Sequence, residues 1–327
     1  MPEIIVIEAT NRCNLNCAHC MKNINGMDGG DVVDIDLYLL DKILKQAAAF
    51  KTRIVALTGG EPTLHAEWEE LIGVLEKHDV NYTFTTNGIN FEETHKVLVK
   101  DASDRFKGIT ISIEGATAGT NDMIRGEGTF DQIVGAMRIC KEKSIPFGMQ
   151  AVIGRHNMHE LSQLAALASE MGADELNYIL MRPSPQNVEF LLSLIESDEV
   201  EEQVGSILDA YRGGRTKIGM TTGYKSPDPF FVCRPLSMSM ISIDYNGLLR
   251  FCVDLTNYRG AISPDTDIIA NLNMKPLTVA LKELSSRVNR FRHNKIDWVS
   301  EGTFSSTDSN PCLYCLRHFN KNDCMSM

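Results

Sequence analysis

Short apolar runs alternate with amphipathic helical stretches over the first part of this 327-residue chain. Six runs are expected to form strands, at residues 4–9, 54–58, 81–85, 108–113, 147–153 and 175–181. Strands that alternate with helices form βαβ units around a parallel sheet. The alternation therefore predicts an α/β fold, either a doubly wound sheet or a partial (β/α)6 TIM-type barrel. In both, functional side chains collect at the carboxyl ends of the strands.

The βα rhythm stops near residue 184, and the later part of the chain has a different character. We therefore predict a first domain at residues 1–212, a Gly/Pro-rich linker at 213–229 and a small cysteine-rich domain at 230–327.

Within the second domain, Asn246-Gly247 between two short apolar runs predicts a β-hairpin. Residues 277–291 predict a helix, and residues 300–327 are expected to be irregular.

Charge and hydropathy exclude several kinds of partner. The formal net charge is -11 and no run of Lys and Arg is present, whereas nucleic acids and anionic membranes bind basic patches. No stretch approaches the roughly 20 apolar residues of a membrane span, and the N-terminus lacks the features of a signal peptide. We therefore expect a cytoplasmic protein with no nucleic-acid and no membrane partner.

The nine cysteines are expected to act as metal ligands or catalytic groups, because the cytoplasm keeps thiols reduced. Cys140 is the exception. It shares a helical apolar stripe with Ile133 and Met137, which predicts a buried core residue.

Cys13, Cys17 and Cys20, here called the N-terminal triplet, form a C-x3-C-x2-C motif just after the first expected strand. A cubane iron–sulfur cluster normally takes four thiolates, so three local ligands leave one iron open to bind another group. The alternative is a zinc site completed by His19. Structural zinc sites, however, usually combine two separated pairs of ligands.

The N-terminal triplet resembles the signature of the radical S-adenosylmethionine (SAM) superfamily, which usually has an aromatic residue where His19 stands. The resemblance covers roughly residues 4–184 and implies the partial (β/α)6 barrel. It also implies that the triplet holds a [4Fe–4S] cluster, that SAM binds the fourth iron, and that the His19 ring lies against the adenine.

The segment Thr58-Gly59-Gly60-Glu61-Pro62 resembles the GGE motif of the same family. In that motif glycines let backbone carbonyls approach the ammonium group of SAM, and Glu61 would supply an acceptor. A plain turn between strand and helix is the alternative, because Gly-Gly and Pro are common turn residues.

Other segments resemble further parts of the family's SAM site. The resemblance implies that Asn87 contacts SAM and that Ser112 and Glu114 bind the ribose. It also implies that Arg125 holds the SAM carboxylate and that Leu180 and Met181 form part of the adenine wall. For Leu180 and Met181, ordinary core packing is an equal alternative.

Five cysteines follow residue 230, and the C-x13-G-x4-C spacing from Cys233 through Gly247 to Cys252 resembles a SPASM/Twitch extension. The long cysteine run of a full SPASM extension is missing. The resemblance therefore implies one auxiliary [4Fe–4S] cluster, held by Cys233, Cys252, Cys312 and Cys315, here called the C-terminal cysteines. Zinc is the alternative, because paired cysteines also suit that metal.

Cys324 is then left over, with three readings open. It is a tail thiol, a substitute ligand, or a catalytic hydrogen-atom donor to a substrate radical.

The resemblance also implies a reaction. A flavodoxin- or ferredoxin-type reductant supplies one electron, SAM is cleaved to a 5′-deoxyadenosyl radical, and this radical removes a hydrogen atom from the substrate. The expected substrate is a peptide, with maturation of a ribosomally made natural product by crosslinking or epimerisation. Dehydrogenation or epimerisation of a small polyol or amino sugar is the second hypothesis. A non-catalytic iron–sulfur or zinc-binding scaffold is the third.

Overall fold

The computed structural model describes residues 1–22, 24–25, 30–101, 103–182, 187–192, 194–222, 228, 230–253, 264–303 and 310–321. Its strands form one ten-stranded sheet in the order β10-β9-β8-β1-β2-β3-β4-β5-β6-β7. The first seven are parallel neighbours: β1 Ile4–Thr10, β2 Ile54–Gly59, β3 Asn81–Thr86, β4 Phe106–Ser112, β5 Phe147–Ile153, β6 Glu175–Leu180 and β7 Lys217–Thr222. The prediction of an α/β fold with a TIM-type parallel sheet is confirmed.

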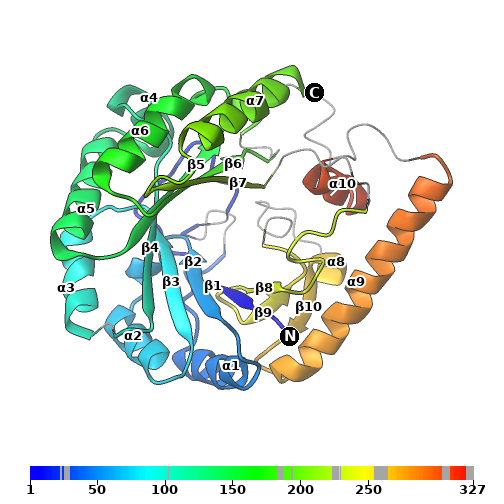
Figure 1. Ribbon diagram of the computed structural model, residues 1–327. Coiled ribbons are helices and arrows are strands. Elements are labelled where there is room, and N and C mark those ends of the chain that lie inside the picture. Colours follow the sequence, from blue (N-terminus) through cyan, green and yellow to red (C-terminus); the bar gives the residue numbers. More distant parts are fainter. Residues whose placement is uncertain are drawn as a thin grey trace.

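Helices connect these strands and pack along the outer side of the curved sheet, as Figure 1 shows. They are α1 Leu37–Ala49, α2 Trp68–Glu76, α3 Phe91–Asp101, α4 Ala118–Arg125, α5 Thr129–Lys143, α6 Leu161–Met171 and α7 Leu194–Ala210. No helix among the described residues is both long enough and apolar enough to cross a bilayer.

Helix α1 illustrates how the sequence builds the outer layer. The Asp36 side chain caps its N-terminus by accepting a hydrogen bond from the Leu39 N–H at 2.7 Å. Leu40, Ile43 and Leu44 then form a buried stripe at helical spacing. In the same way, Cys140 of α5 is completely buried, as its apolar stripe predicts.

The C-terminal part of the chain continues the same sheet instead of forming a separate one. Strand β8 (Met240–Ile243) pairs parallel with β1, β9 (Leu248–Arg250) pairs antiparallel with β8, and β10 (Ile268–Asn271) pairs antiparallel with β9. The predicted hairpin at Asn246-Gly247 is therefore present between β8 and β9. The division into two domains remains a prediction.

Two features of the C-terminal half differ from the expectations. Strand β7 lies within the expected linker and adds a seventh parallel strand. The expected irregular tail contains α10 (Pro311–His318), which begins where the Asn310 side chain accepts from the Cys312 and Leu313 N–H groups. The predicted helix at 277–291 is present as the longer α9 (Leu277–Ser300), and α8 (Pro264–Asp267) is one turn.

Candidate active site

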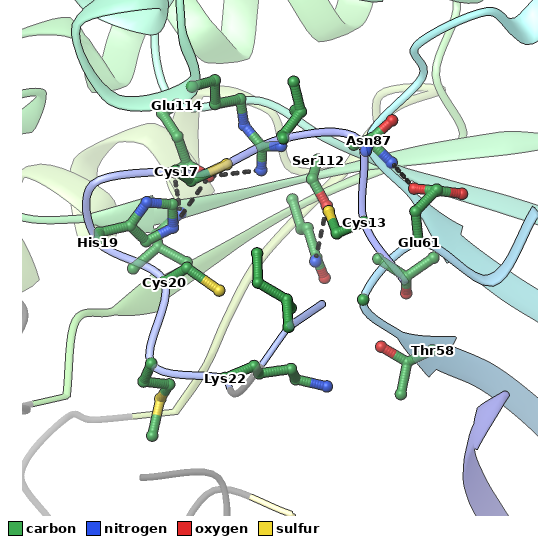
Figure 2. Close-up of a pocket in the computed structure, with 18 of the residues that line it drawn as sticks. Cys13, Cys17, His19, Cys20, Lys22, Thr58, Glu61, Asn87, Ser112 and Glu114 are labelled. Carbon is green, nitrogen blue, oxygen red and sulfur yellow. Dashed lines mark hydrogen bonds and ion pairs between the residues drawn. The ribbon is translucent and has the colours of Figure 1, made fainter. Parts of the chain in front are cut away.

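The N-terminal triplet lies on the loop that follows β1. Asn25 closes this loop, because its side chain accepts from the Cys13 N–H at 2.9 Å and donates to the Cys13 carbonyl at 2.7 Å. Farther along, the Ala18 N–H donates to the carbonyl of Ile124 in α4 at 2.8 Å. All three cysteines line one cavity of about 220 Å³, and Figure 2 shows their sulfur atoms directed into it.

The same cavity gathers every residue that the sequence predicts for SAM binding. These residues follow β2, β3, β4 and β6 at their carboxyl ends or lie on the triplet loop and α4. They are His19, Gly59, Gly60, Glu61, Asn87, Ser112, Glu114, Arg125, Leu180 and Met181. Their shared location is what parallel strands would produce, whereas the contact that each makes with a ligand remains a prediction.

The two glycines at the end of β2 allow a close approach of two backbone segments. A Cβ atom on Gly59, which has a φ of +145°, would lie 2.3 Å from the Thr10 carbonyl oxygen. On Gly60 it would lie 2.1 Å from the Arg12 carbonyl oxygen. The Gly60 N–H instead donates to the Thr10 carbonyl at 2.8 Å. Glycine is therefore required here to pack β2 against the start of the triplet loop.

Glu61 joins the ends of β2 and β3. One carboxylate oxygen accepts from the hydroxyls of Thr63 (2.8 Å) and Thr86 (2.9 Å), and the other accepts from the Asn87 N–H at 2.7 Å. Burial raises the pKa of Glu61, and these donors oppose the rise. Asn87 extends the link, since its side-chain amide donates to Asn14 of the triplet loop at 2.7 Å.

Glu114 and Arg125 form a buried ion pair beside the N-terminal triplet. Arg125 Nη2 donates to Glu114 Oε1 at 2.8 Å, and the two side chains are 7% and 1% exposed. The second oxygen of Glu114 accepts from the Val152 N–H at 2.8 Å. Burial raises the pKa of Glu114, although Arg125 works in the opposite direction. Glu114 thus connects β4 to α4 and β5. A ribose hydroxyl bound there would share the Glu114 oxygens with Arg125 and the Val152 N–H.

His19 lies next to this pair, with Nε2 at 3.5 Å from Glu114 Oε1. Burial, followed by the charge of Arg125, lowers the pKa of His19 to about 3. The ring is therefore neutral at physiological pH. Its Nδ1 is buried and has no hydrogen-bond partner among the residues that the structure describes.

Several cavity residues carry no sequence signal of their own. Lys22, Gln150, Arg182 and Asn187 also line the cavity. Gln150 donates to Ser112 at 3.1 Å, and Asn187 donates to the His19 carbonyl at 3.4 Å. Gln150 could have been found from its position, because it faces inward on β5 beside Ser112 of β4.

The C-terminal cysteines lie shortly before β8 (Cys233), directly after β9 (Cys252) and on α10 (Cys312 and Cys315). Burial raises the pKa of Cys315 well above its usual value, and Cys233, Cys312 and Cys252 raise it further through their charges. Cys233, Cys252 and Cys312 therefore lie within electrostatic range of Cys315, and that the four thiols hold one cluster together remains a prediction. Cys315 is buried on α10, and the other three are half-buried. Cys324 lies outside the described residues.

The residues that line the cavity of the N-terminal triplet fit an iron–sulfur cluster with a polar ligand. Burial raises the pKa of Cys13 to about 11 and that of Cys17 to about 12, so each thiolate needs a cation beside it. Arg125 Nε, like His19 Nδ1, is buried with no hydrogen-bond partner in the described part of the chain. Among the described residues, no group of three or more His, Cys, Asp or Glu is arranged to hold a single metal ion.

Comparison with known proteins agrees with this geometry. Residues 7–168 match the model of the Radical SAM superfamily. The chain is 30% identical to the mycofactocin maturase MftC of Mycobacterium tuberculosis over 239 residues, which are 73% of this chain and 57% of that protein. It is also 24% identical to the PqqA peptide cyclase of Gluconobacter oxydans over 326 residues, or 97% and 83% of the two chains. The chain thus spans less than two thirds of the mycofactocin maturase that it matches.

Solved structures support the fold. The Streptococcus suis protein SuiB bound to S-adenosylmethionine superposes with a TM-score of 0.69 at 17% identity, covering 86% of this chain and 65% of that one. The protein anSMEcpe with bound AdoMet gives a TM-score of 0.65 at 16% identity, covering 87% and 80%. A further SuiB structure contains its precursor peptide SuiA, with a TM-score of 0.66.

Proposed function

Because residues 7–168 form a radical SAM domain, we propose that the protein is a radical SAM enzyme whose substrate is a peptide. The observation that carries this proposal is the convergence of the N-terminal triplet, the Gly59-Gly60-Glu61 turn and the Glu114–Arg125 pair on one cavity. The peptide is favoured because relatives include a mycofactocin maturase and a PqqA peptide cyclase, and because SuiB has been solved with a precursor peptide. Maturation by crosslinking or epimerisation is the proposed outcome.

The N-terminal triplet would hold a [4Fe–4S] cluster, and the cavity residues around it would hold SAM. When bound, these groups supply a 5′-deoxyadenosyl radical that removes a hydrogen atom from the substrate. The residues of the chain fix the geometry. Glu61 holds the end of β2 to β3, and Asn87 holds β3 to the triplet loop. A site fixed in this way orients the reacting groups and excludes water.

The buried pair of Glu114 and Arg125 would set the charge of the site. The Arg125 guanidinium offers Nε as a donor for a ligand carboxylate, while Nη2 stays on Glu114. Neutral His19 would present a flat ring to the adenine. These roles follow from orientation and charge, and neither requires a proton transfer.

The C-terminal cysteines would hold one auxiliary [4Fe–4S] cluster. This proposal is supported by the charges of Cys233, Cys312 and Cys252, each of which raises the pKa of buried Cys315. A flavodoxin- or ferredoxin-type reductant would supply the electron, and the acidic chain would work in the cytoplasm. Cys324 would be a spare thiol, a substitute ligand or a hydrogen-atom donor.

The test is the formation of 5′-deoxyadenosine from SAM by anaerobically reconstituted protein with dithionite. Wild type should form this product, and Ala at Cys13, Cys17 or Cys20 should abolish it. Cys140→Ala is the matched control, because Cys140 is buried in the core on α5 and does not line the cavity. Iron analysis should give enough iron for two clusters, and loss of Cys312 and Cys315 should remove half. Absence of the product from fully loaded wild type would contradict the proposal.

The substrate class needs its own measurement. Transfer of deuterium from labelled candidate peptides into 5′-deoxyadenosine would identify the hydrogen that is removed. Transfer from a polyol or amino sugar, with none from peptides, would favour the second hypothesis of small-molecule dehydrogenation or epimerisation.

A further inference from the structure

Asn25 binds the backbone of a predicted cluster ligand, and the proposed function gives it no role. Its Oδ1 accepts from the Cys13 N–H at 2.9 Å, and its Nδ2 donates to the Cys13 carbonyl at 2.7 Å. A side-chain amide carries an acceptor and a donor on one group. Both backbone groups of Cys13 therefore point toward Asn25, which fixes the orientation of this residue.

These two bonds close the base of the loop that carries the N-terminal triplet. Twelve positions separate Cys13 from Asn25, and Cys17 and Cys20 lie between them. The Asn25 N–H also donates to the carbonyl of Asn11, directly after β1, at 2.8 Å. The loop is thus closed by the chain itself, and less conformational entropy is lost when the thiols take up positions around a cluster.

The backbone at position 25 explains why an asparagine stands there. Its φ is +53°, in the left-handed region that Asn and Gly adopt more readily than most other residues. The preceding Ile24 is 2% exposed and lines the cavity, which anchors this part of the chain. Asn25 itself is exposed, so its side chain adds little to the packing of the core. A substitution at this position therefore removes chiefly the two bonds to Cys13.

The backbone that Asn25 holds also directs a hydrogen bond at the Cys13 sulfur. Burial raises the pKa of the Cys13 thiol to about 11, and the hydrogen bond that the Leu15 N–H donates to this sulfur opposes the rise. Asn14 lies between the two, and its Oδ1 accepts from the Asn87 amide at 2.7 Å. The two residues before Leu15 are therefore both fixed. An N–H bond to a ligand sulfur stabilises the added negative charge of a reduced cluster and so raises its reduction potential.

The other two members of the N-terminal triplet are held in a different way. The Cys20 N–H donates to the Cys17 carbonyl at 3.0 Å, so these two residues share a turn. Between them, the Ala18 N–H donates to a carbonyl of α4 at 2.8 Å. Loss of the Asn25 side chain should therefore disturb Cys13 and leave this turn in place.

We propose that Asn25 is a positioning residue for the Cys13 thiolate, which it directs toward the cluster and toward the Leu15 N–H. It acts through the Cys13 backbone and is not among the residues that line the cavity. The inference rests on the proposed function in one respect, namely that the N-terminal triplet holds the [4Fe–4S] cluster. Without Asn25, the unloaded loop should open at its base, and the loaded cluster should be harder to reduce.

The first test needs no metal. In unloaded full-length protein, Asn25→Gly should speed hydrogen–deuterium exchange at the Cys13 amide about fivefold, the scale of one hydrogen bond. Glycine adopts the left-handed conformation freely, so the substitution removes the two bonds without backbone strain. Asn90→Gly is the matched control, because Asn90 is exposed, has a φ of +54° and is not among the residues that line the cavity. In this control the Cys13 amide should exchange as in wild type.

The second test is a redox titration of anaerobically reconstituted protein, followed by electron paramagnetic resonance. The N-terminal cluster is the one whose signal changes when SAM is added. At the midpoint potential of wild type, half of this cluster is reduced. At the same potential, Asn25→Gly should have about one sixth reduced, because weakening the Leu15 bond changes the equilibrium about fivefold. A signal that does not respond to SAM should titrate as in wild type.

Faster exchange together with a lowered midpoint potential supports the inference. Exchange at Cys13 that stays at the wild-type rate overturns it, as does an unchanged midpoint potential or a change that Asn90→Gly reproduces. A wild-type protein with no signal that responds to SAM would instead overturn the proposed function. In that event the exchange measurement, which uses no metal, still decides whether Asn25 positions Cys13.

Discussion

Replacing Arg125 by Met should destabilise the protein strongly at neutral pH. The substitution removes the guanidinium at 2.8 Å from Glu114 and leaves a carboxylate that is 1% exposed. The Val152 N–H at 2.8 Å then remains as a donor to that carboxylate. Breaking a buried ion pair by removing one partner costs about 3–5 kcal/mol. We expect a loss of this size in the free energy of unfolding.

The loss should depend on pH, with a sign that follows from Glu114. Burial raises the pKa of Glu114 and Arg125 opposes this rise, so the pKa in the folded variant lies higher still. When a buried acid has a higher pKa in the folded protein than in the unfolded chain, the folded protein loses stability as the pH rises above the pKa of the unfolded chain. Each pH unit between the two pKa values costs about 1.4 kcal/mol. The deficit of Arg125→Met should therefore shrink as the pH is lowered from about 7 to about 5.

Urea unfolding followed by far-UV circular dichroism, under anaerobic conditions, measures this effect. The double variant Arg125→Met with Glu114→Gln should recover much of the loss, because no charge is left buried alone. Arg212→Met is the control, since Arg212 pairs with Asp209 on the surface and both side chains are mostly exposed. A loss for Arg125→Met that matched this control, or that did not change with pH, would refute the reasoning.

Three further substitutions, two of them with a control variant, test contacts described above by thermal unfolding. Gly60→Ala should destabilise clearly, because its Cβ would lie 2.1 Å from a backbone carbonyl oxygen, whereas Gly119→Ala in open space on α4 should stabilise by about 0.5–1 kcal/mol. Asp36→Ala should cost about 1 kcal/mol through loss of the α1 cap, and Asp36→Asn should cost much less. Glu61→Gln should cost about 1–3 kcal/mol, because an amide cannot accept from Thr63, Thr86 and Asn87 at once. Unchanged melting temperatures for Gly60→Ala or Glu61→Gln would contradict these contacts.

The first six strands and the location of the candidate site could be predicted from the sequence. Each of those strands is a short apolar run between helical segments, and parallel strands end at one edge of a sheet. This local information is enough to place the N-terminal triplet, Glu61, Asn87 and Ser112 around one cavity.

The remaining parts depend on contacts between distant segments. Nothing in residues 4–10 indicates that β8 pairs with the free edge of β1, because the partner lies far along the chain. Strand β7 was missed since its run, Lys217–Thr222, contains a glycine and follows a Gly-rich stretch. Helix α10 did have a local signal, because Asn310-Pro311 is typical of a helix N-cap followed by proline.

The roles of the glycines also needed the structure. The resemblance implies that Gly59 and Gly60 let backbone carbonyls approach a ligand, which stays a prediction. The structure adds a second role, because both glycines make room for the backbone at Thr10 and Arg12. Similarly, no pattern shows that Asp244 uses one carboxylate oxygen for a turn and the other for Arg250. Such pairings appear only when the side chains have definite positions.

The pairing of β8 with β1 has a consequence for how the chain matures during synthesis. Until Met240–Ile243 leaves the ribosome, β1 presents an unpaired edge with Ile4, Ile5 and Ile7, and an open apolar edge favours association with other strands. β8 therefore covers this edge of β1. A nascent or truncated chain that stops before β8 would need a chaperone or would aggregate, even though its signature cysteines are already in place.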